Sequence, residues 1–475
     1  MDKTINKNGN YKRLILNTVL FAIGQFGPSL LGFFLVPIYT NCMSQSEFGT
    51  ADLVINLSNL LIPFVSICIT DGVVKFSLDG KHDKNSVFSV SFFICLLGSI
   101  LSFIAYPFIY KYGQISGYVL LFYMVLITSV FNNLLLLYIK SIKRLKLYTI
   151  IALVKSAIML ISNIIALRVL NLKTEGFLWS FIISNIAGCL MAVLTARLHH
   201  FISIRNLQKK TTKEMVAFSL PLIPNQASIS VMTSMDRYML TYLLDSSYNG
   251  LYSVAHKIPD FVGRLSMVFN QAWNYSVLEN QTQNIKNNYY QSIYTLYSSY
   301  MFIIASIVMM LIRPIMYVWV GAEFRDAWLY APYLLISIIF SCFTGFYVPL
   351  FVICEKTGTL FISTLAGAIT NLTLNYLLIP IWGINGASFA SAVGYLVVWL
   401  MRGIMIKKYV KIEFDNIKAI INAIILILQG TCLIKLALSY FWVQIVILSI
   451  VILINIKDIK NLVIFLKNSL LRKSH

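Results

Sequence analysis

Six charged residues lie inside long apolar stretches of this sequence, where a charge is costly. They are Lys155, Arg237, Lys257, Arg264, Asp236 and Asp260. A charged side chain at the centre of a bilayer costs at least ~2.5–3.5 kcal/mol, so it usually faces a partner or a cavity. The excess of two positive charges matches a diphosphate diester, which carries about two negative charges. We therefore predict an anion-binding site.

The two arginines are the first candidates for the diphosphate, because a planar guanidinium pairs with two phosphate oxygens at once. Lys257 and Lys155 are expected to make secondary contacts. The alternative is a structural role for all these charges. In that interpretation Asp260 neutralises Lys257 or Arg264, and Asp236 neutralises a residue on another helix.

The spacing of these residues favours a common site. Arg237 lies ten residues before Ser247, the centre of a predicted turn, and Lys257 lies ten residues after it. At ~1.5 Å per residue, both lie roughly 10–15 Å below the outer surface. Lys257, Asp260 and Arg264 are spaced i, i+3 and i+7, so they share one helix face.

Three amide side chains accompany helix-interrupting prolines. Gln25 precedes a Gly-Pro pair, and Asn225 and Gln226 follow Pro224. Proline frees backbone carbonyls in a helix, so polar groups are expected nearby. These amides are candidates for hydrogen bonds to sugar hydroxyls. The alternative is that they hold neighbouring helices together.

The elements that must position these residues are transmembrane helices. The chain has 475 residues, 58% hydrophobic and 12% charged, and its apolar runs of about twenty residues match the thickness of a bilayer. We predict an all-α polytopic membrane protein of about fourteen helices, or twelve if the last two runs do not span. The predicted helices are 14–40, 51–75, 87–110, 117–140, 147–170, 175–198, 214–244, 249–273, 288–319, 327–354, 359–380, 385–406, 416–437 and 439–456.

The net charge of +20 indicates how the chain is oriented in the membrane and does not indicate a nucleic-acid partner. With the N-terminus inside, 28 of the 38 Lys and Arg residues fall in or beside inside segments, 6 fall outside and 4 lie within spans. Both termini are therefore predicted to be cytoplasmic, in a bacterial inner membrane. The basic loop 199–213 is expected to be a linker, with binding of anionic headgroups as the alternative.

The chain shows no sign of catalysis or of a cofactor. Its seven cysteines are scattered without a CxxC pair, so no metal site is expected. No GxxxxGK[ST] loop for nucleotide occurs. The outside loops are too short to form a catalytic platform. We predict a transporter that is not an enzyme and needs no cofactor.

Two halves of the chain resemble each other. Helix starts near 14 and 214 keep almost the same offset as Gly49 and Gly250, which are 201 residues apart. Paired halves with proline-interrupted helices point to a transporter site between them. The predicted domains are 1–198, the linker 199–213, 214–408, and a final helix pair with its tail at 409–475.

Four segments carry a family resemblance, at 24–54, 235–260, 269–280 and 371–395. The first reads GQFGPSLLGFFLVPIYTNCMSQSEFGTADLV and the second MDRYMLTYLLDSSYNGLYSVAHKIPD. In this order they resemble the Wzx-type flippases for O-antigen and capsule, the polysaccharide-transport branch of the MATE-like flippase superfamily. The resemblance covers residues 14 to about 408.

The resemblance implies a fold and a cargo. The fold is two six-helix bundles that face each other across a cavity. The cargo is an undecaprenyl-diphosphate-linked oligosaccharide, moved from the cytoplasmic to the outer face. Membrane lipids, and polymerase and chain-length proteins of the same pathway, are the expected partners. The alternatives are a MATE-like small-molecule exporter, which the cationic excess argues against, and a membrane-embedded glycan polymerase or ligase.

Overall fold

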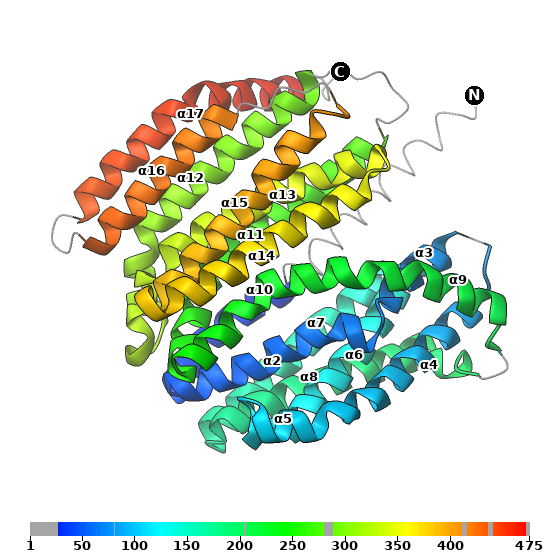
Figure 1. Ribbon diagram of the computed structural model, residues 1–475. Helices are drawn as coiled ribbons and strands as arrows, with labels where there is room; N and C mark the ends of the chain where they lie inside the picture. The colour runs from blue at the N-terminus through cyan, green and yellow to red at the C-terminus, as the bar shows by residue number, and fades with distance from the viewer. Residues whose placement is uncertain are drawn as a thin grey trace, which may run out of the picture. The chain divides into compact units, whose positions relative to one another are not determined.

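The protein is an all-α polytopic membrane protein, as the sequence predicts. The computed structural model describes residues 27–79, 81–203, 206–279, 288–410, 416–435 and 440–471 (Figure 1). These residues form helices and connecting turns and contain no strand. Within them, twelve helical segments are long and apolar enough to cross a membrane. The chain is therefore a multi-pass membrane protein.

The described chain divides into two compact units, the first of which ends at Gly250. Residues 27–42 of this unit are helical. The helices that follow are α2 (Gln45–Val65), α3 (Ile69–Leu78), α4 (Lys84–Ser102), α5 (Tyr106–Tyr112), α6 (Val119–Ser141), α7 (Leu145–Asn163), α8 (Lys173–Ala196), α9 (Lys209–Ser219) and α10 (Ile223–Leu243). Within the unit α6 packs against α2, α3 and α8, and α7 packs against α8.

Prolines divide two of the predicted helices. The predicted helix 51–75 is two helices, α2 and α3, because Pro63 interrupts the hydrogen-bond ladder and Ile67 and Cys68 adopt positive φ angles of 46° and 55°. The predicted helix 214–244 is likewise divided into α9 and α10 by a short 3₁₀ segment, Leu220–Leu222, that contains Pro221. Both divisions place polar side chains beside a loosened backbone.

The second unit begins at Leu251, within α11 (Ser246–Glu279). Its other helices are α12 (Asn288–Trp319), α13 (Ala331–Ile353), α14 (Thr357–Trp382), α15 (Ile384–Ile406), α16 (Asn416–Lys435) and α17 (Tyr440–Leu471). In Figure 1 α12, α16 and α17 lie side by side, and α15 packs against α13 and α14. Both of the last two apolar runs contain a candidate span.

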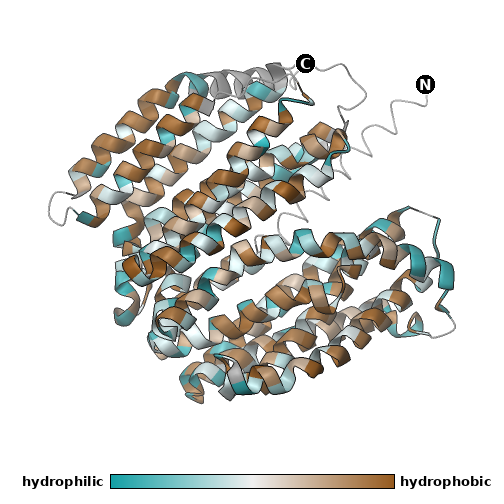
Figure 2. Cartoon of the chain, in the orientation of Figure 1, coloured by the Kyte–Doolittle hydropathy of each residue, from teal (hydrophilic) through white to brown (hydrophobic). Residues whose placement is uncertain are grey.

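The distribution of side chains is that of a membrane protein. Large apolar residues are exposed, such as Val318 at 88% and Ile104 at 75%. Figure 2 shows hydrophobic residues along the whole length of most helices. Serine and asparagine side chains are buried in contrast, for example Asn163 and Asn371 at 0%. Helices that meet in lipid pack through such small and polar residues.

The two matched glycines of the predicted repeat lie in contact at the end of the first unit. A Cβ atom on Gly49 would lie 1.8 Å from the Ser246 carbonyl oxygen, and one on Gly250 would lie 2.1 Å from the Gln45 carbonyl oxygen. The Asn249 amide donates a hydrogen bond of 2.7 Å to the Gly49 carbonyl. Only glycine permits this backbone approach. The division into repeats at 199–213 stays a prediction.

Candidate functional site

A cluster of polar groups surrounds one lysine inside the first unit. This Lys155 cluster consists of Lys155 on α7, Asn132 on α6, and Asn185 and Gly188 on α8. The Lys155 ammonium group donates a hydrogen bond of 2.8 Å to Asn132 Oδ1. The Asn132 amide nitrogen lies 3.4 Å from the Asn185 carbonyl oxygen, and both asparagines are buried. The cluster therefore links three candidate spans through polar groups.

Glycine makes room for this arrangement. A Cβ atom on Gly188 would lie 2.6 Å from Asn132 Nδ2 and 3.5 Å from Lys155 Cδ. Lysine has three N–H donors, and within the described ranges a single acceptor, the Asn132 amide oxygen, contacts them. No carboxylate of those residues pairs with Lys155. The ammonium group thus keeps donors for a ligand.

The second predicted cation of the first unit is already paired. Arg237 Nε on α10 lies 3.2 Å from Asp52 Oδ2 on α2, and both side chains are nearly buried. Arg237 Nη1 also donates a hydrogen bond of 2.6 Å to the Thr233 carbonyl oxygen. Asp236, the neighbouring acidic residue, is 2% exposed. Arg237 therefore joins α10 to α2 in this conformation.

The predicted amides near Pro224 lie at the start of α10. The Gln226 amide donates to Asp71 Oδ2 on α3 over 3.4 Å, and Asn225 is half-buried beside it. Gln226 therefore links two helices of the first unit. Lys75, one turn after Asp71, lies 3.8 Å from the centre of the Phe218 ring. The third predicted amide, Gln25, lies outside the described residues.

The remaining predicted residues lie on α11 in the second unit. Asp260 Oδ1 lies 3.1 Å from His256 Nδ1, one turn earlier on the same helix. Lys257 is half-buried and Arg264 is exposed. With these charges, α11 is not among the twelve apolar candidate spans, although it is 34 residues long.

Sequence reasoning missed a buried arginine in the second unit. Arg402 on α15 is 8% exposed, although the charge count above assigns it to the inside loops. Its guanidinium group donates to Ser363 Oγ at 3.1 Å, the Thr344 carbonyl at 2.9 Å and Thr364 Oγ1 at 2.9 Å. In the part of the chain that is described, no carboxylate neutralises it. Because Arg402 lies near the end of the predicted helix 385–406, its charge was counted with the adjacent inside loop and its buried position was not predicted.

Asp52 is the other missed residue. It lies at the start of the predicted helix 51–75, and its negative charge offsets the positive charge of Arg402, so the predicted excess of two positive charges is unchanged. A single acidic residue near the start of an apolar run was the available signal. It carried no information on its partner, because Arg237 is 185 residues away in the sequence.

Comparison with known proteins identifies the architecture. A family model described as "Polysaccharide biosynthesis protein" matches residues 14–275. No curated protein sequence matches the chain significantly. The lipid II flippase MurJ in its inward closed conformation is similar in structure, with a TM-score of 0.66 and 14% identity over 94% of this chain and 100% of that one.

Multidrug transporters share the fold as well. An inward-facing MATE family transporter of the MOP superfamily gives a TM-score of 0.57 with 12% identity over 81% of this chain and 94% of that one. A mutant of the Vibrio cholerae MATE transporter VcmN gives 0.56 with 13% identity over 84% and 97%. At such low identity the likeness establishes the fold alone.

Proposed function

We propose, since the chain belongs to the family of polysaccharide biosynthesis proteins, that it is a flippase for a lipid-linked oligosaccharide. Its cargo in this proposal is an undecaprenyl-diphosphate-linked repeat unit, moved from the cytoplasmic to the outer face of the inner membrane for O-antigen, capsule or exopolysaccharide synthesis. Transport proceeds by alternating access and involves no covalent chemistry.

The Lys155 cluster is the observation that carries this proposal. A cation inside a candidate span, without a carboxylate partner among the residues described, is suited to an anionic ligand. The neighbouring amides of Asn132 and Asn185 are the groups that recognise sugar hydroxyls. A cargo that combines phosphate with sugar uses both kinds of group.

The ion pair between Arg237 and Asp52 supplies a second element of the proposal. A diphosphate oxygen competes with the Asp52 carboxylate for the guanidinium group, because both supply anionic oxygens that accept hydrogen bonds from the planar guanidinium fork. Binding of cargo would then weaken the contact between α2 and α10. This exchange gives the ligand different affinities for two arrangements of these helices, which is the requirement for driving a conformational change.

The other predicted contacts follow from position and charge. Arg264 and Lys257 on α11 are proposed as cations for the diphosphate, and Asp260 adjusts their charge together with His256. In the first unit Asp236 has the same role beside the ion pair, and Asn225, Gln226 and Gln25 are proposed contacts for sugar hydroxyls. These assignments extend the proposal beyond the Lys155 cluster.

Reconstitution tests the function directly. Purified protein in proteoliposomes that contain an undecaprenyl-diphosphate-linked oligosaccharide should make the sugar accessible to an added membrane-impermeant glycosidase faster than protein-free vesicles do. Lys155→Met should slow this exposure and Lys155→Arg should largely preserve it. If the protein leaves the lipid-linked sugar in place but accumulates an organic cation, it is an exporter and the proposal is wrong.

A double substitution tests Arg237 separately. Arg237→Leu alone strands the buried Asp52 carboxylate, so protein abundance should fall. Arg237→Leu with Asp52→Leu should restore abundance, because two apolar side chains replace a buried pair. If Arg237 binds cargo, the double variant remains defective in transport. Normal transport by the double variant would show that the pair is structural only.

A further inference from the structure

A groove in the first unit lies outside the Lys155 cluster and the ion pair. It is formed by α4 and α9, which pack against each other, and has a volume of about 680 Å³. Small-molecule sites occupy roughly 300–1,000 Å³. Both helices belong to candidate membrane spans. The groove therefore lies on helical segments that are candidates to cross the membrane.

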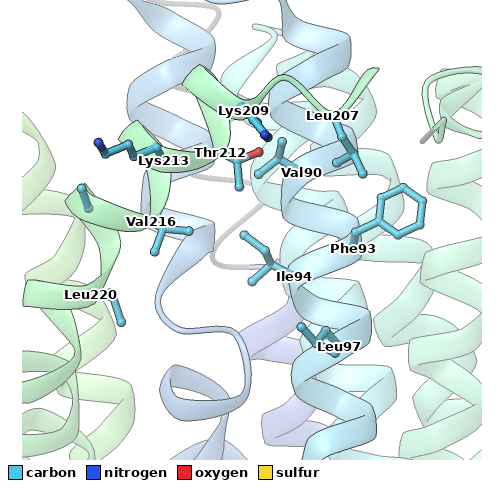
Figure 3. A pocket seen from close by; sticks show the side chains of 11 residues that line it. Val90, Phe93, Ile94, Leu97, Leu207, Lys209, Thr212, Lys213, Val216 and Leu220 are labelled. Carbon is cyan, nitrogen blue, oxygen red and sulfur yellow. The ribbon is translucent and has the colours of Figure 1, made fainter. Parts of the chain in front are cut away.

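The lining of the groove is divided by polarity. Eight of its eleven lining residues are apolar, and the other three are Lys209, Thr212 and Lys213. Figure 3 shows Lys209 and Thr212 at one end of the groove and Leu97 and Leu220 at the other. Lys209 and Leu220 are separated by eleven residues, about 16 Å along a helix. The groove thus has a cationic end and an apolar length.

The walls of the groove are held in place by contacts behind them. Glu214 on α9 is not one of the lining residues and accepts a hydrogen bond of 2.7 Å from His82 Nε2. Ser89 on α4 donates to the Phe201 carbonyl. None of the described residues that line the groove carries a carboxylate.

We infer that this groove binds an anionic phospholipid of the surrounding membrane. The phosphodiester lies between the ammonium groups of Lys209 and Lys213, both exposed, and an acyl chain lies along Ile94, Leu97 and Val216. The charges complement each other, and a basic pocket at the end of membrane helices is the form that such headgroup sites take. The bound lipid would stabilise the contact between α9 and α4.

Lipid titration by native mass spectrometry of the full-length protein in detergent tests the inference. The probes are dioleoyl phosphatidylglycerol and dioleoyl phosphatidylcholine. Each lysine near an anionic headgroup contributes about 1 kcal/mol, so Lys209→Ser with Lys213→Ser should weaken retention of phosphatidylglycerol about 30-fold. The matched control, Lys143→Ser with Lys146→Ser, removes the same charge from two exposed positions at the start of α7 and should change retention less than about threefold.

A second variant locates the lipid. Ala217→Phe fills part of the groove without a change of charge and should abolish one bound phosphatidylglycerol. Equal losses in the two lysine pairs would overturn the inference, because they indicate diffuse attraction. Unchanged binding by Ala217→Phe would place the lipid elsewhere. Displacement of phosphatidylglycerol by equimolar undecaprenyl phosphate would assign the groove to cargo and not to membrane lipid.

Discussion

The Lys155 cluster and the surroundings of Arg402 are two regions that each bury a cation without a neutralising carboxylate among the described residues. They differ in how completely the cation is bonded. Arg402 is 8% exposed and donates to three acceptors from two neighbouring helices. Lys155 is half-buried and donates to one acceptor. Each of the three guanidinium nitrogens of Arg402 thus donates a hydrogen bond, whereas Lys155 uses one of its three N–H donors.

The difference separates structural from binding charges better than burial alone does. Burying a cation costs less free energy when its donors have acceptors, and removal of such a cation disturbs the packing around it. A cation with unused N–H donors is stabilised when an anion binds to it. In the structure both residues are positive charges inside candidate spans, although the charge count from the sequence assigned Arg402 to the inside loops. Substitution of each residue tests the comparison.

Arg402→Ala should have the largest effect on stability. It removes three hydrogen bonds from a charged donor and leaves a cavity between α13, α14 and α15, so we expect a loss of about 3 kcal/mol. Thermal unfolding of the purified protein should show a lower melting temperature. Transport per folded molecule should stay near that of the wild type. A stable Arg402→Ala variant without transport would place this residue with the binding cations.

Lys155→Met should have the opposite profile. It keeps the length of the side chain and removes the charge, and one charge-assisted hydrogen bond to a phosphate is worth about 1.5–3 kcal/mol. Transport should fall about 10- to 100-fold while the melting temperature changes little. The proteoliposome assay measures the first quantity and thermal unfolding the second. A large loss of stability would remove the distinction between the two regions.

Gly188→Ala should produce an intermediate defect in the Lys155 cluster. The new Cβ would lie 2.6 Å from Asn132 Nδ2, so the amide must move and its oxygen leaves Lys155. We expect transport to fall about 3- to 10-fold with a small change in stability. Gly32→Ala is the matched control, because nothing lies within 4 Å of its added Cβ. Equal effects of the two substitutions would contradict a steric role.

The sequence predicted the fold far better than it predicted the partners of the site residues. The apolar runs predicted the bounds of most helices closely, and α12 (Asn288–Trp319) begins and ends at the predicted residues, 288 and 319. Helical periodicity is local, however, and the ion pair of Arg237 with Asp52 joins residues far apart in the chain. The bond from Arg402 to the Thr344 carbonyl likewise depends on how three helices pack. The spacing of residues within one helix predicts neither this ion pair nor this hydrogen bond.

His82, which lies outside the candidate spans, supplies the smallest expected effect and a third arrangement, a histidine paired with two carboxylates. Burial lowers the pKa of His82, but hydrogen bonds to Glu214 and Asp79 outweigh this and raise its pKa above the ordinary value. A raised pKa in the folded state means that protonated His82 stabilises the fold. This contribution is complete below about pH 6.5 and is lost as the pH rises through the raised value.

The melting temperature of the wild type should therefore fall slightly more between pH 6 and pH 8 than that of His82→Gln. Glutamine keeps a hydrogen bond but does not titrate, so the difference between the two proteins isolates the charge. The effect is smaller than that of Arg402→Ala, because both carboxylate partners are partly exposed and water screens the pairs. The control is His200→Gln, at an exposed histidine in the short 3₁₀ segment Leu198–His200 after α8. If His82→Gln and wild type respond identically to pH, the bond between His82 and Glu214 does not hold α9 through its charge.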